Sequence, residues 1–365
     1  MTRWDHLPDL ASRRLGGGVV AANDELFAAA DHLVLDEPPS FSARTFGPKG
    51  QVYDGWETRR RREPGHDHAI VRLGAPGIVR GVVVDTSFFT GNYPPYASVE
   101  GCCVDGHPGP SELSEWFPLV PRSPLAGDSR NEFVVSNVER RVTHVRLSIY
   151  PDGGVARLRI HGEVVPDPRL LPAVIDLAAM EHGGQVVACS NMFYGPPHQL
   201  IAPGLARVMG EGWETARRRD DANDWVVVKL AAPGRVRLAE LDTSHFKGNA
   251  PGAASLRGLD ARTADMDHPA AWAELLPRIP LQPDTRHRFP LDESPVVSHV
   301  RMDIYPDGGM ARLRLWGDLT DDARTTLTSH WQATSAPPPS PAPALSPADQ
   351  GAPARPADQG QTHAL

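Results

Sequence analysis

A motif that contains a glutamate and is followed by arginines occurs twice in the chain, and these residue types could bind or transform a polar ligand. Each copy reads Gly-Trp-Glu-Thr, with a carboxylate followed closely by guanidinium groups. The residues are Glu57, Arg60 and Arg61 in the first copy and Glu214, Arg217 and Arg218 in the second. Such a set can hold a polar ligand that has both a carboxylate and amide-like N–H groups. The alternative is a solvated loop of surface charges.

A second shared motif reads Asp-Thr-Ser-x-Phe-x-Gly-Asn. It contributes Asp85 and Asn92 in the first copy and Asp242 and Asn249 in the second. Each aspartate follows a strand-like run, so we expect it at a strand end, where loops often build sites. The alternative is an Asx-type turn, in which these side chains cap backbone N–H groups.

The second copy of this motif carries two further candidates, His245 and Lys247, where the first copy has Phe88 and Thr90. Histidine is the side chain best suited to proton transfer near neutral pH. This difference favours the second copy as the better-equipped site.

A third shared motif, Tyr-Pro-Asp-Gly-Gly-x-Ala-Arg, is explained mostly by a tight turn. It also places an arginine, Arg157 or Arg312, at the same position of both copies. His66-Asp67-His68 has the composition of a metal site, but the second copy has Asn223-Asp224-Trp225 there. Zinc and manganese sites usually need three or more converging ligands, so a divalent metal remains an open question.

These motifs belong to a tandem duplication. HVRLSIYPDGGVARLRIHG (144–162) aligns with HVRMDIYPDGGMARLRLWG (299–317), and 14 of the 19 positions are identical. We place the copies at 7–165 and 174–320. The offset between them falls from 167 residues near the start to 157 at Gly-Trp-Glu-Thr, so the first copy has ten additional residues between Leu35 and Asp54. An insertion of this kind is expected in a surface loop.

Within each copy the apolar pattern is typical of short strands. Stretches 68–87 and 224–244 contain a β-branched run, a Pro-Gly pair and a second run, which predicts a hairpin or a strand corner. The 144–160 stretch alternates on both sides of Pro-Asp-Gly-Gly and predicts a hairpin. The expected fold is all-β, a tandem of jelly-roll β-sandwiches. Residues 334–365 are rich in Pro and Ala, and we expect a disordered tail.

Composition excludes several classes of function. The net charge of −8 argues against a nucleic-acid surface, and no apolar run is long enough to cross a membrane. The N-terminal residues lack the apolar run of a secretory signal. The three cysteines, Cys102, Cys103 and Cys189, are odd in number and favour a reducing compartment. We therefore expect a cytoplasmic protein with a small-molecule ligand.

Taken together, the motifs resemble the allantoicase (allantoate amidinohydrolase) family of purine and allantoin degradation. The resemblance rests on Gly-Trp-Glu-Thr, on VDTSFFTGNYPP (84–95) and LDTSHFKGNAPG (241–252), and on the paired IYPDGGxARLR segments. It implies two galactose-binding-like jelly rolls and the hydrolysis of allantoate to (S)-ureidoglycolate and urea, a reaction at a C–N bond of a linear amidine. It also implies a homo-oligomer.

The implied products define what the site must do. If urea leaves intact, the broken bond joins the central carbon to a ureido nitrogen, so an acid must protonate that nitrogen and a base or metal must deliver water. The predicted catalytic residues are Asp242, His245, Glu214, Asp85 and Glu57. The predicted substrate-binding residues are Arg217, Arg218, Lys247, Asn249, Arg312, Arg60, Arg61, Asn92 and Arg157. The rival hypothesis is a non-catalytic jelly-roll module that binds a sugar or another small polar ligand.

Overall fold

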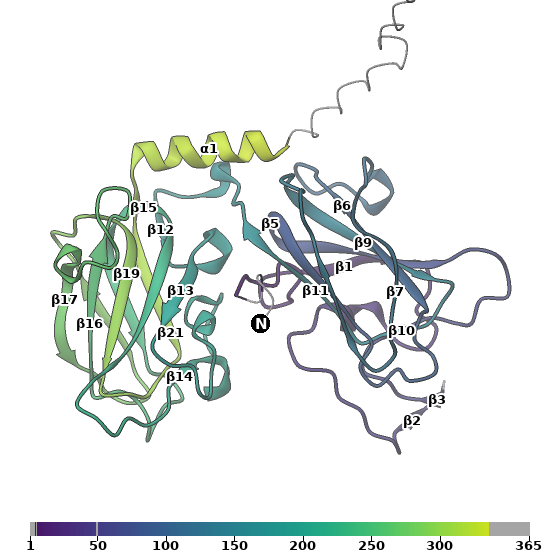
Figure 1. Ribbon diagram of the computed structural model, residues 1–365, viewed down its shortest axis with the longest axis horizontal. Coiled ribbons are helices and arrows are strands. Elements are labelled where there is room, and N and C mark those ends of the chain that lie inside the picture. The colour runs from purple at the N-terminus through teal and green to yellow at the C-terminus, as the bar shows by residue number, and fades with distance from the viewer. Residues whose placement is uncertain (1–3, 5, 49, 336–365) are drawn as a thin grey trace, which may run out of the picture.

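The described part of the chain forms two β-sandwiches and one α-helix, with short 3₁₀ turns between strands (Figure 1). The computed structural model describes residues 4, 6–48 and 50–335. The predicted all-β tandem duplication is confirmed. Of the predicted tail, residues 336–365 lie outside the described residues, whereas Thr334 and Ser335 belong to the helix. No helix among the described residues has the length and apolar character needed to cross a membrane.

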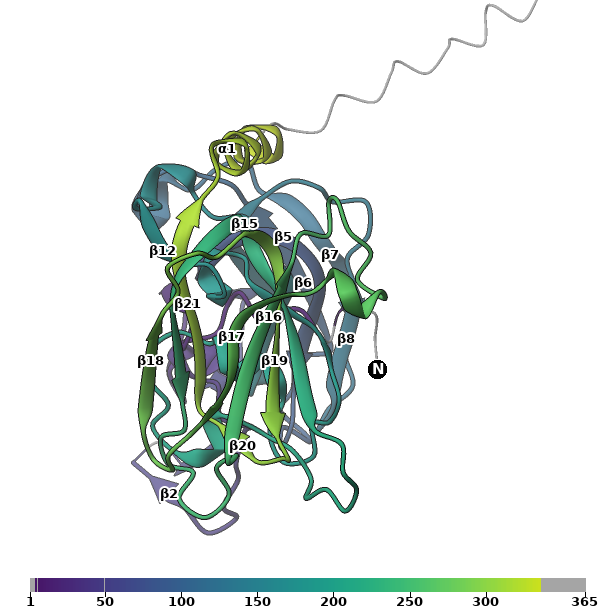
Figure 2. The same ribbon diagram turned by 90° about the vertical axis from the view of Figure 1, so that its left-hand side faces the viewer.

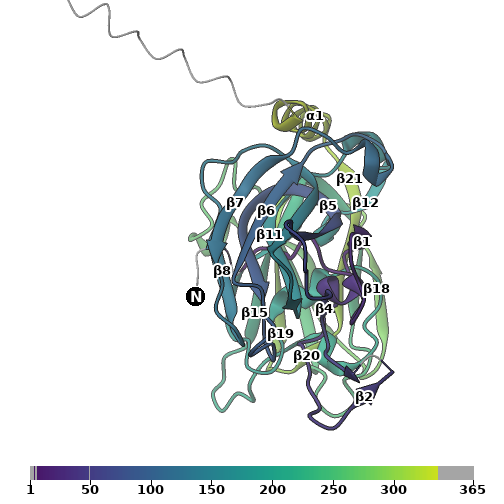
Figure 3. The ribbon, with the colours of Figure 1, turned by 90° about the vertical axis from the view of Figure 1, so that its right-hand side faces the viewer.

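The first sandwich, repeat 1, is built around one seven-stranded sheet in the order β1-β5-β9-β6-β7, with β8 and β11 also paired to β5. Figure 3 shows these strands from the side of repeat 1. Its strands are β1 (Gly18–Ala22), β2 (Phe46–Gly47), β3 (Gly50–Gln51), β4 (Trp56–Glu57), β5 (Asp67–Asp85), β6 (Tyr96–Cys102), β7 (Phe117–Pro124), β8 (Arg130–Val134), β9 (Val142–Tyr150), β10 (Gly154–Val155) and β11 (Arg157–Val164).

The second sandwich, repeat 2, has an eight-stranded sheet in the order β12-β21-β15-β19-β16-β17, with β13 and β18 also paired to β15. Figure 2 shows this repeat from its outer side. Its strands are β12 (Val174–Asp176), β13 (Gln185–Cys189), β14 (Trp213–Glu214), β15 (Asp224–Asp242), β16 (Ala253–Leu259), β17 (Ala273–Pro280), β18 (Arg286–Pro290), β19 (Val296–Tyr305), β20 (Gly309–Met310) and β21 (Arg312–Leu319).

The Pro-Gly pair in each long apolar stretch is a strand corner, one of the two predicted outcomes. β5 continues through it for 19 residues and changes partners there. Residues 67–72 pair with β9, whereas residues 77–85 pair with β11. The single strand therefore belongs to both layers of the sandwich and carries Asp85 to one end of it.

The predicted hairpin at Tyr-Pro-Asp-Gly-Gly is wrong. β9 pairs with β5 and β6, and β11 pairs with β5, so the two arms do not pair with each other. The turn residues form the short strand β10, which pairs with β4 and so with the Gly-Trp-Glu-Thr motif. Alternation alone could not distinguish a hairpin from a crossing between layers, because both require the same buried faces.

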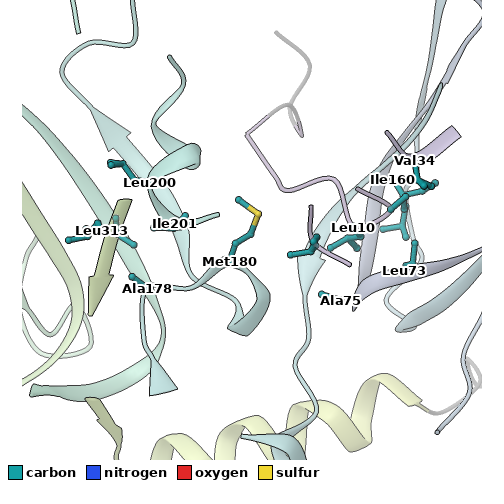
Figure 4. Packing of buried hydrophobic residues seen from close by; sticks show 14 of the residues in the cluster. Leu10, Val34, Leu73, Ala75, Ile160, Ala178, Met180, Leu200, Ile201 and Leu313 are labelled. Atoms are coloured by element: carbon teal, nitrogen blue, oxygen red, sulfur yellow. The ribbon is translucent and has the colours of Figure 1, made fainter. Parts of the chain in front are cut away.

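One continuous hydrophobic cluster includes buried residues of both repeats. Figure 4 shows Met180 between the core residues of repeat 2, such as Leu200, and those of repeat 1, such as Leu10. Met180 belongs to the 3₁₀ turn η4 (Met180–His182). The two sandwiches therefore share part of their core.

Helix α1 (Asp321–Ser335) follows repeat 2 but packs on repeat 1, and the sequence analysis did not predict it. Trp331 lies in a small buried cluster with Ile78 and Val165. The Arg141 guanidinium carbon lies 3.2 Å from the centre of the Trp331 ring, and Arg141 Nη1 donates to the Trp331 carbonyl at 2.8 Å. The helix therefore connects the two repeats across their upper side (Figure 1).

Candidate functional site

Each repeat brings its acidic motif and its asparagine together at one end of the sandwich. Asn92 Nδ2 donates to Glu57 Oε1 at 2.7 Å, and Asn249 Nδ2 donates to Glu214 Oε1 at 2.6 Å. All four residues are half-buried. The Gly-Trp-Glu-Thr and Asp-Thr-Ser motifs therefore meet in each copy. We call Glu57 with Asn92, and Glu214 with Asn249, the Glu–Asn pair of each repeat.

The backbone around this pair is fixed by close contacts. In repeat 1, β4 pairs with β10 so that Glu57 lies opposite Gly154. A Cβ at Gly154 would lie 2.0 Å from the ring of Phe89, so only glycine permits this approach. Thr58 and Gly153 also exchange hydrogen bonds, at 3.2 Å and 3.1 Å. The Tyr-Pro-Asp-Gly-Gly turn thus supports the Glu–Asn pair.

The electrostatics of Glu57 suit proton transfer. Burial raises the pKa of Glu57 above its usual value, and the hydrogen bond from Asn92 opposes that shift. A carboxyl group with a raised pKa holds a proton closer to neutral pH, as a general acid must.

Asp85 and Asp242 adopt the Asx-type turn that was the alternative to a catalytic role. Asp85 Oδ1 accepts hydrogen bonds from Ser87 N at 2.9 Å and Ser87 Oγ at 2.6 Å, and Asp242 Oδ1 accepts one from Ser244 N at 2.8 Å. The two aspartates are only 3% and 1% exposed. Their observed contacts shape the loop that carries the asparagine.

His245 and Lys247 lie at the outside of the same loop. His245 has φ 72°, as Phe88 has φ 70° in repeat 1, so this backbone conformation belongs to the turn in both copies. The Nε2 atom of His245 lies 3.0 Å from the carbonyl oxygen of Ala206. Lys247 is 80% exposed, and its Nζ lies 3.9 Å from Asp284. Neither side chain forms a hydrogen bond or ion pair with Glu214 or Asp242 in the described part of the chain.

The arginines behind Gly-Trp-Glu-Thr have two different roles. Arg61 Nη1 contacts Asp67 at 2.5 Å, and Arg218 Nη1 contacts Asp224 at 2.7 Å. These two arginines are tied to the start of the long strand. Arg60 and Arg217 are exposed, and among residues 6–48 and 50–335 neither takes part in an ion pair.

Arg157 and Arg312 are only 1% exposed and act inside the protein. Arg157 contacts Asp54 through Nη1 at 2.9 Å and Nη2 at 3.0 Å. Among the residues that the structure describes, the side chain of Arg312 donates only to backbone carbonyls, including that of Glu211 at 2.7 Å, and burial lowers its pKa to about 10. Direct contact of either arginine with a substrate therefore has no support in the geometry.

The sequence analysis missed the acidic residue that precedes Gly-Trp-Glu-Thr. It is Asp54 in repeat 1 and Glu211 in repeat 2, and both copies show it in the sequence. The repetition of this acidic residue was visible in the sequence, but the arginines that it contacts lie far away along the chain. Arg157 is 103 positions away from Asp54, and Arg14 Nη2 contacts Glu211 at 2.8 Å from the other repeat.

A family model described as the allantoicase repeat matches residues 8–165 and 175–320. The chain is 58% identical over 322 residues to a protein of Nocardia farcinica named probable allantoicase, covering 87% of this chain and 95% of that one. A probable allantoicase of Streptomyces coelicolor is 50% identical over 340 residues, 89% of each chain. The chain belongs to the allantoicase family.

The fold agrees with this assignment. The crystal structure of allantoicase from Saccharomyces cerevisiae superimposes with a TM-score of 0.73 at 35% identity, covering 85% of this chain and 92% of that one. The shared duplication of the sandwich is therefore a family feature.

The His66-Asp67-His68 stretch does not converge as a metal site in this member of the allantoicase family. The two imidazole rings are 6.4 Å apart, and His66 lies against Tyr150 at 4.7 Å. Asp67 accepts from Arg61 and from Asn23 Nδ2 at 3.1 Å. Among the described residues, no group of three or more His, Cys, Asp or Glu side chains is arranged to hold a metal ion.

Two cavities of about 750 and 800 Å³ are lined by residues of both repeats. Neither is lined by Glu57, Asn92, Glu214 or Asn249. The volume of a cavity therefore does not identify the motifs that both repeats share.

Proposed function

We propose that this protein hydrolyses allantoate to ureidoglycolate and urea, and that the Glu–Asn pairs are where the substrate is cleaved. Membership of the allantoicase family supports the reaction. The observation that supports the location is the pairing of Glu57 with Asn92 and of Glu214 with Asn249, because two distant motifs meet there in both repeats.

The reaction breaks one C–N bond. Water adds its oxygen to the central carbon of allantoate, the bond from that carbon to one ureido nitrogen breaks, and the nitrogen gains a proton as urea leaves. Ureidoglycolate retains the water oxygen as its hydroxyl group. The ureido carbonyl is not attacked, so no oxyanion hole is required.

The residues of the pair can supply the proton and hold the ureido group. A protonated glutamic acid can donate to the leaving nitrogen, and the ionised form can accept a ureido N–H. The asparagine can donate to a ureido oxygen while it positions the glutamate. Arg60 or Arg217, which is exposed and follows the glutamate by three residues, is the proposed partner of the substrate carboxylate.

Asp85, Asp242 and the inner arginines have positioning roles in this proposal. Asp85 and Asp242 hold the loop of the asparagine, and Arg61 and Arg218 hold the loop of the glutamate. His245 and Lys247 are proposed to contact the substrate only at the edge of repeat 2, because both lie at the outside of its loop.

The test is turnover of allantoate by the full chain in ¹⁸O-labelled water. We expect urea to be released and the label to appear in the hydroxyl of ureidoglycolate, as measured by mass spectrometry. N-carbamoylglycine, which has one ureido group and no second nitrogen on its central carbon, should release no urea. Absence of urea from allantoate would contradict the proposed activity, and label in carbon dioxide would contradict the proposed bond.

Location and assembly are further proposals. The three cysteines are free thiols, which supports a reducing, cytoplasmic setting. Assembly into a homo-oligomer is implied by the family resemblance, and light scattering of the purified protein would measure it.

A further inference from the structure

The larger of the two cavities is a charged cleft that only the complete two-repeat protein can form. Its volume is about 800 Å³, which lies within the range of small-molecule sites. Repeat 1 contributes Arg14 and Glu37 among its lining residues, and repeat 2 contributes His198, Arg207 and Glu211. We call it the inter-repeat cleft.

Guanidinium and carboxylate groups alternate along this cleft. Glu211 contacts both Arg14, at 2.8 Å, and Arg207, at 2.6 Å. Arg207 also reaches Glu37 of the other repeat at 3.3 Å. Arg159 lies 3.4 Å from Asp9 on the repeat 1 side. The lining can therefore receive both an anionic group and hydrogen-bond donors of a ligand.

Comparison of the repeats shows that Glu211 is diverted from a structural role. At the equivalent position Asp54 neutralises the buried Arg157 of its own repeat. Glu211 gives only its backbone carbonyl to Arg312, and its carboxylate is directed to Arg14 and Arg207. Burial alone would raise the pKa of Glu211, but hydrogen bonds from Arg207 and the charge of Arg14 lower it. The cleft thus holds an ionised carboxylate, and among the described residues no carboxylate forms an ion pair with Arg312.

His198 provides a neutral donor and acceptor in the same cleft. It lies on the 3₁₀ turn η5 (Pro197–Ile201), and its imidazole forms no hydrogen bond among the described residues. His198 is exposed to solvent, yet partial desolvation in the cleft and the charges of Arg14 and His161 together lower its pKa. A neutral imidazole can donate through one nitrogen and accept through the other.

We propose that the inter-repeat cleft is a second ligand site, which binds a small carboxylate that carries ureido or amide groups. The carboxylate is bound by Arg14 and Arg207, and the N–H groups are bound by Glu211 and His198. The choice of a ureido ligand rests in part on the proposed function, because allantoate and ureidoglycolate both belong to this class. The cleft is separate from the Glu–Asn pairs, none of whose residues lines it.

The test is calorimetric titration with N-carbamoylglycine, in a full chain that carries Glu57→Gln and Glu214→Gln so that the Glu–Asn pairs do not contribute. We expect one ligand per chain. Arg207→Gln should weaken binding at least ~10-fold, because it removes a charged hydrogen bond. Acetate, which lacks the ureido group, should bind at least ~10-fold more weakly than N-carbamoylglycine.

A filling variant separates occupancy of the cleft from loss of charge. Gly210 lines the cleft, and a Cβ at this position would meet no atom within 4 Å. Gly210→Phe should abolish binding, whereas the matched control Gly210→Ala should retain it within ~3-fold. Circular dichroism and the melting temperature verify that both variants fold.

Three results would overturn the second site: no binding of N-carbamoylglycine, binding that survives both Gly210→Phe and Arg207→Gln, or equal binding of acetate. Each is measured without turnover. Cleft binding by the double variant, together with no release of urea by the wild-type chain, would retain this inference and contradict the proposed function. Release of urea by the wild-type chain without cleft binding by the double variant would do the opposite.

Discussion

Replacement of Trp331 by alanine tests the role of helix α1 in holding the repeats together. The side chain is 8% exposed and packs against Ile78 and Val165 of repeat 1. A buried tryptophan covers up to ~250 Å², which at about 25 cal/mol per Å² gives an upper limit of ~6 kcal/mol. Truncations of large aromatic residues usually cost about 3–5 kcal/mol. We therefore expect Trp331→Ala to lower the free energy of unfolding by about 4 kcal/mol.

The assay is guanidinium unfolding followed by far-ultraviolet circular dichroism. Gln332→Ala is the matched control, because Gln332 is the exposed neighbour on the same helix and should change the free energy by less than about 0.5 kcal/mol. Arg141 stacks on Trp331 and is itself only 1% exposed, so its loss of a partner adds to the effect. A change below about 1 kcal/mol in Trp331→Ala would refute the view that the helix fastens repeat 2 to repeat 1.

Three further predictions concern single groups. Asn92→Ala removes the hydrogen bond that opposes the effect of burial, so a ¹³C carboxyl titration should show a higher pKa for Glu57; an unchanged or lower pKa would contradict the pairing. Burial first, then Arg72 and His107, lowers the pKa of His144 to about 4. An imidazole with a depressed pKa stabilises the fold above about pH 6.5, and this stability is lost as the pH falls towards 4. Wild type should therefore lose about 2 kcal/mol more than His144→Gln between pH 8 and pH 5, and equal losses would speak against a neutral buried His144. Gly154→Ala should cost about 1–3 kcal/mol through collision with Phe89, and adding Phe89→Leu should recover part of that loss in thermal unfolding; strictly additive effects would exclude the contact.

The duplication and the all-β class were predictable because identical motifs recur and the apolar pattern alternates. The strand corner at Pro-Gly was one of two predicted outcomes. The predicted hairpin at 144–160 was wrong because β9 and β11 each pair with β5, which is far away in sequence. Helix α1 carries only three buried residues, Ala323, Trp331 and Thr334, so it lacks a strong apolar stripe, and its threonines are poor helix formers.

The candidate site could be predicted only in part. Glu57 and Asn92 have identical counterparts in repeat 2, Glu214 and Asn249, so comparison of the two copies predicts both motifs. The Asx-type turn of Asp85 was one of two alternatives in the sequence, because an aspartate before Thr-Ser suits both a catalytic role and a turn. The inter-repeat cleft was not predictable, since Arg14 and Glu211 are separated by 197 positions and meet only through packing of the repeats.

The most direct measurement is the kcat for allantoate of Glu57→Gln, Glu214→Gln and the double variant, each with its melting temperature. General acid or base catalysis contributes about 10²- to 10⁴-fold, so the double variant should lose at least ~100-fold while remaining folded. The single variant with the larger loss identifies the more active repeat. A folded double variant with kcat within ~3-fold of wild type would contradict the assignment of allantoate cleavage to the Glu–Asn pairs.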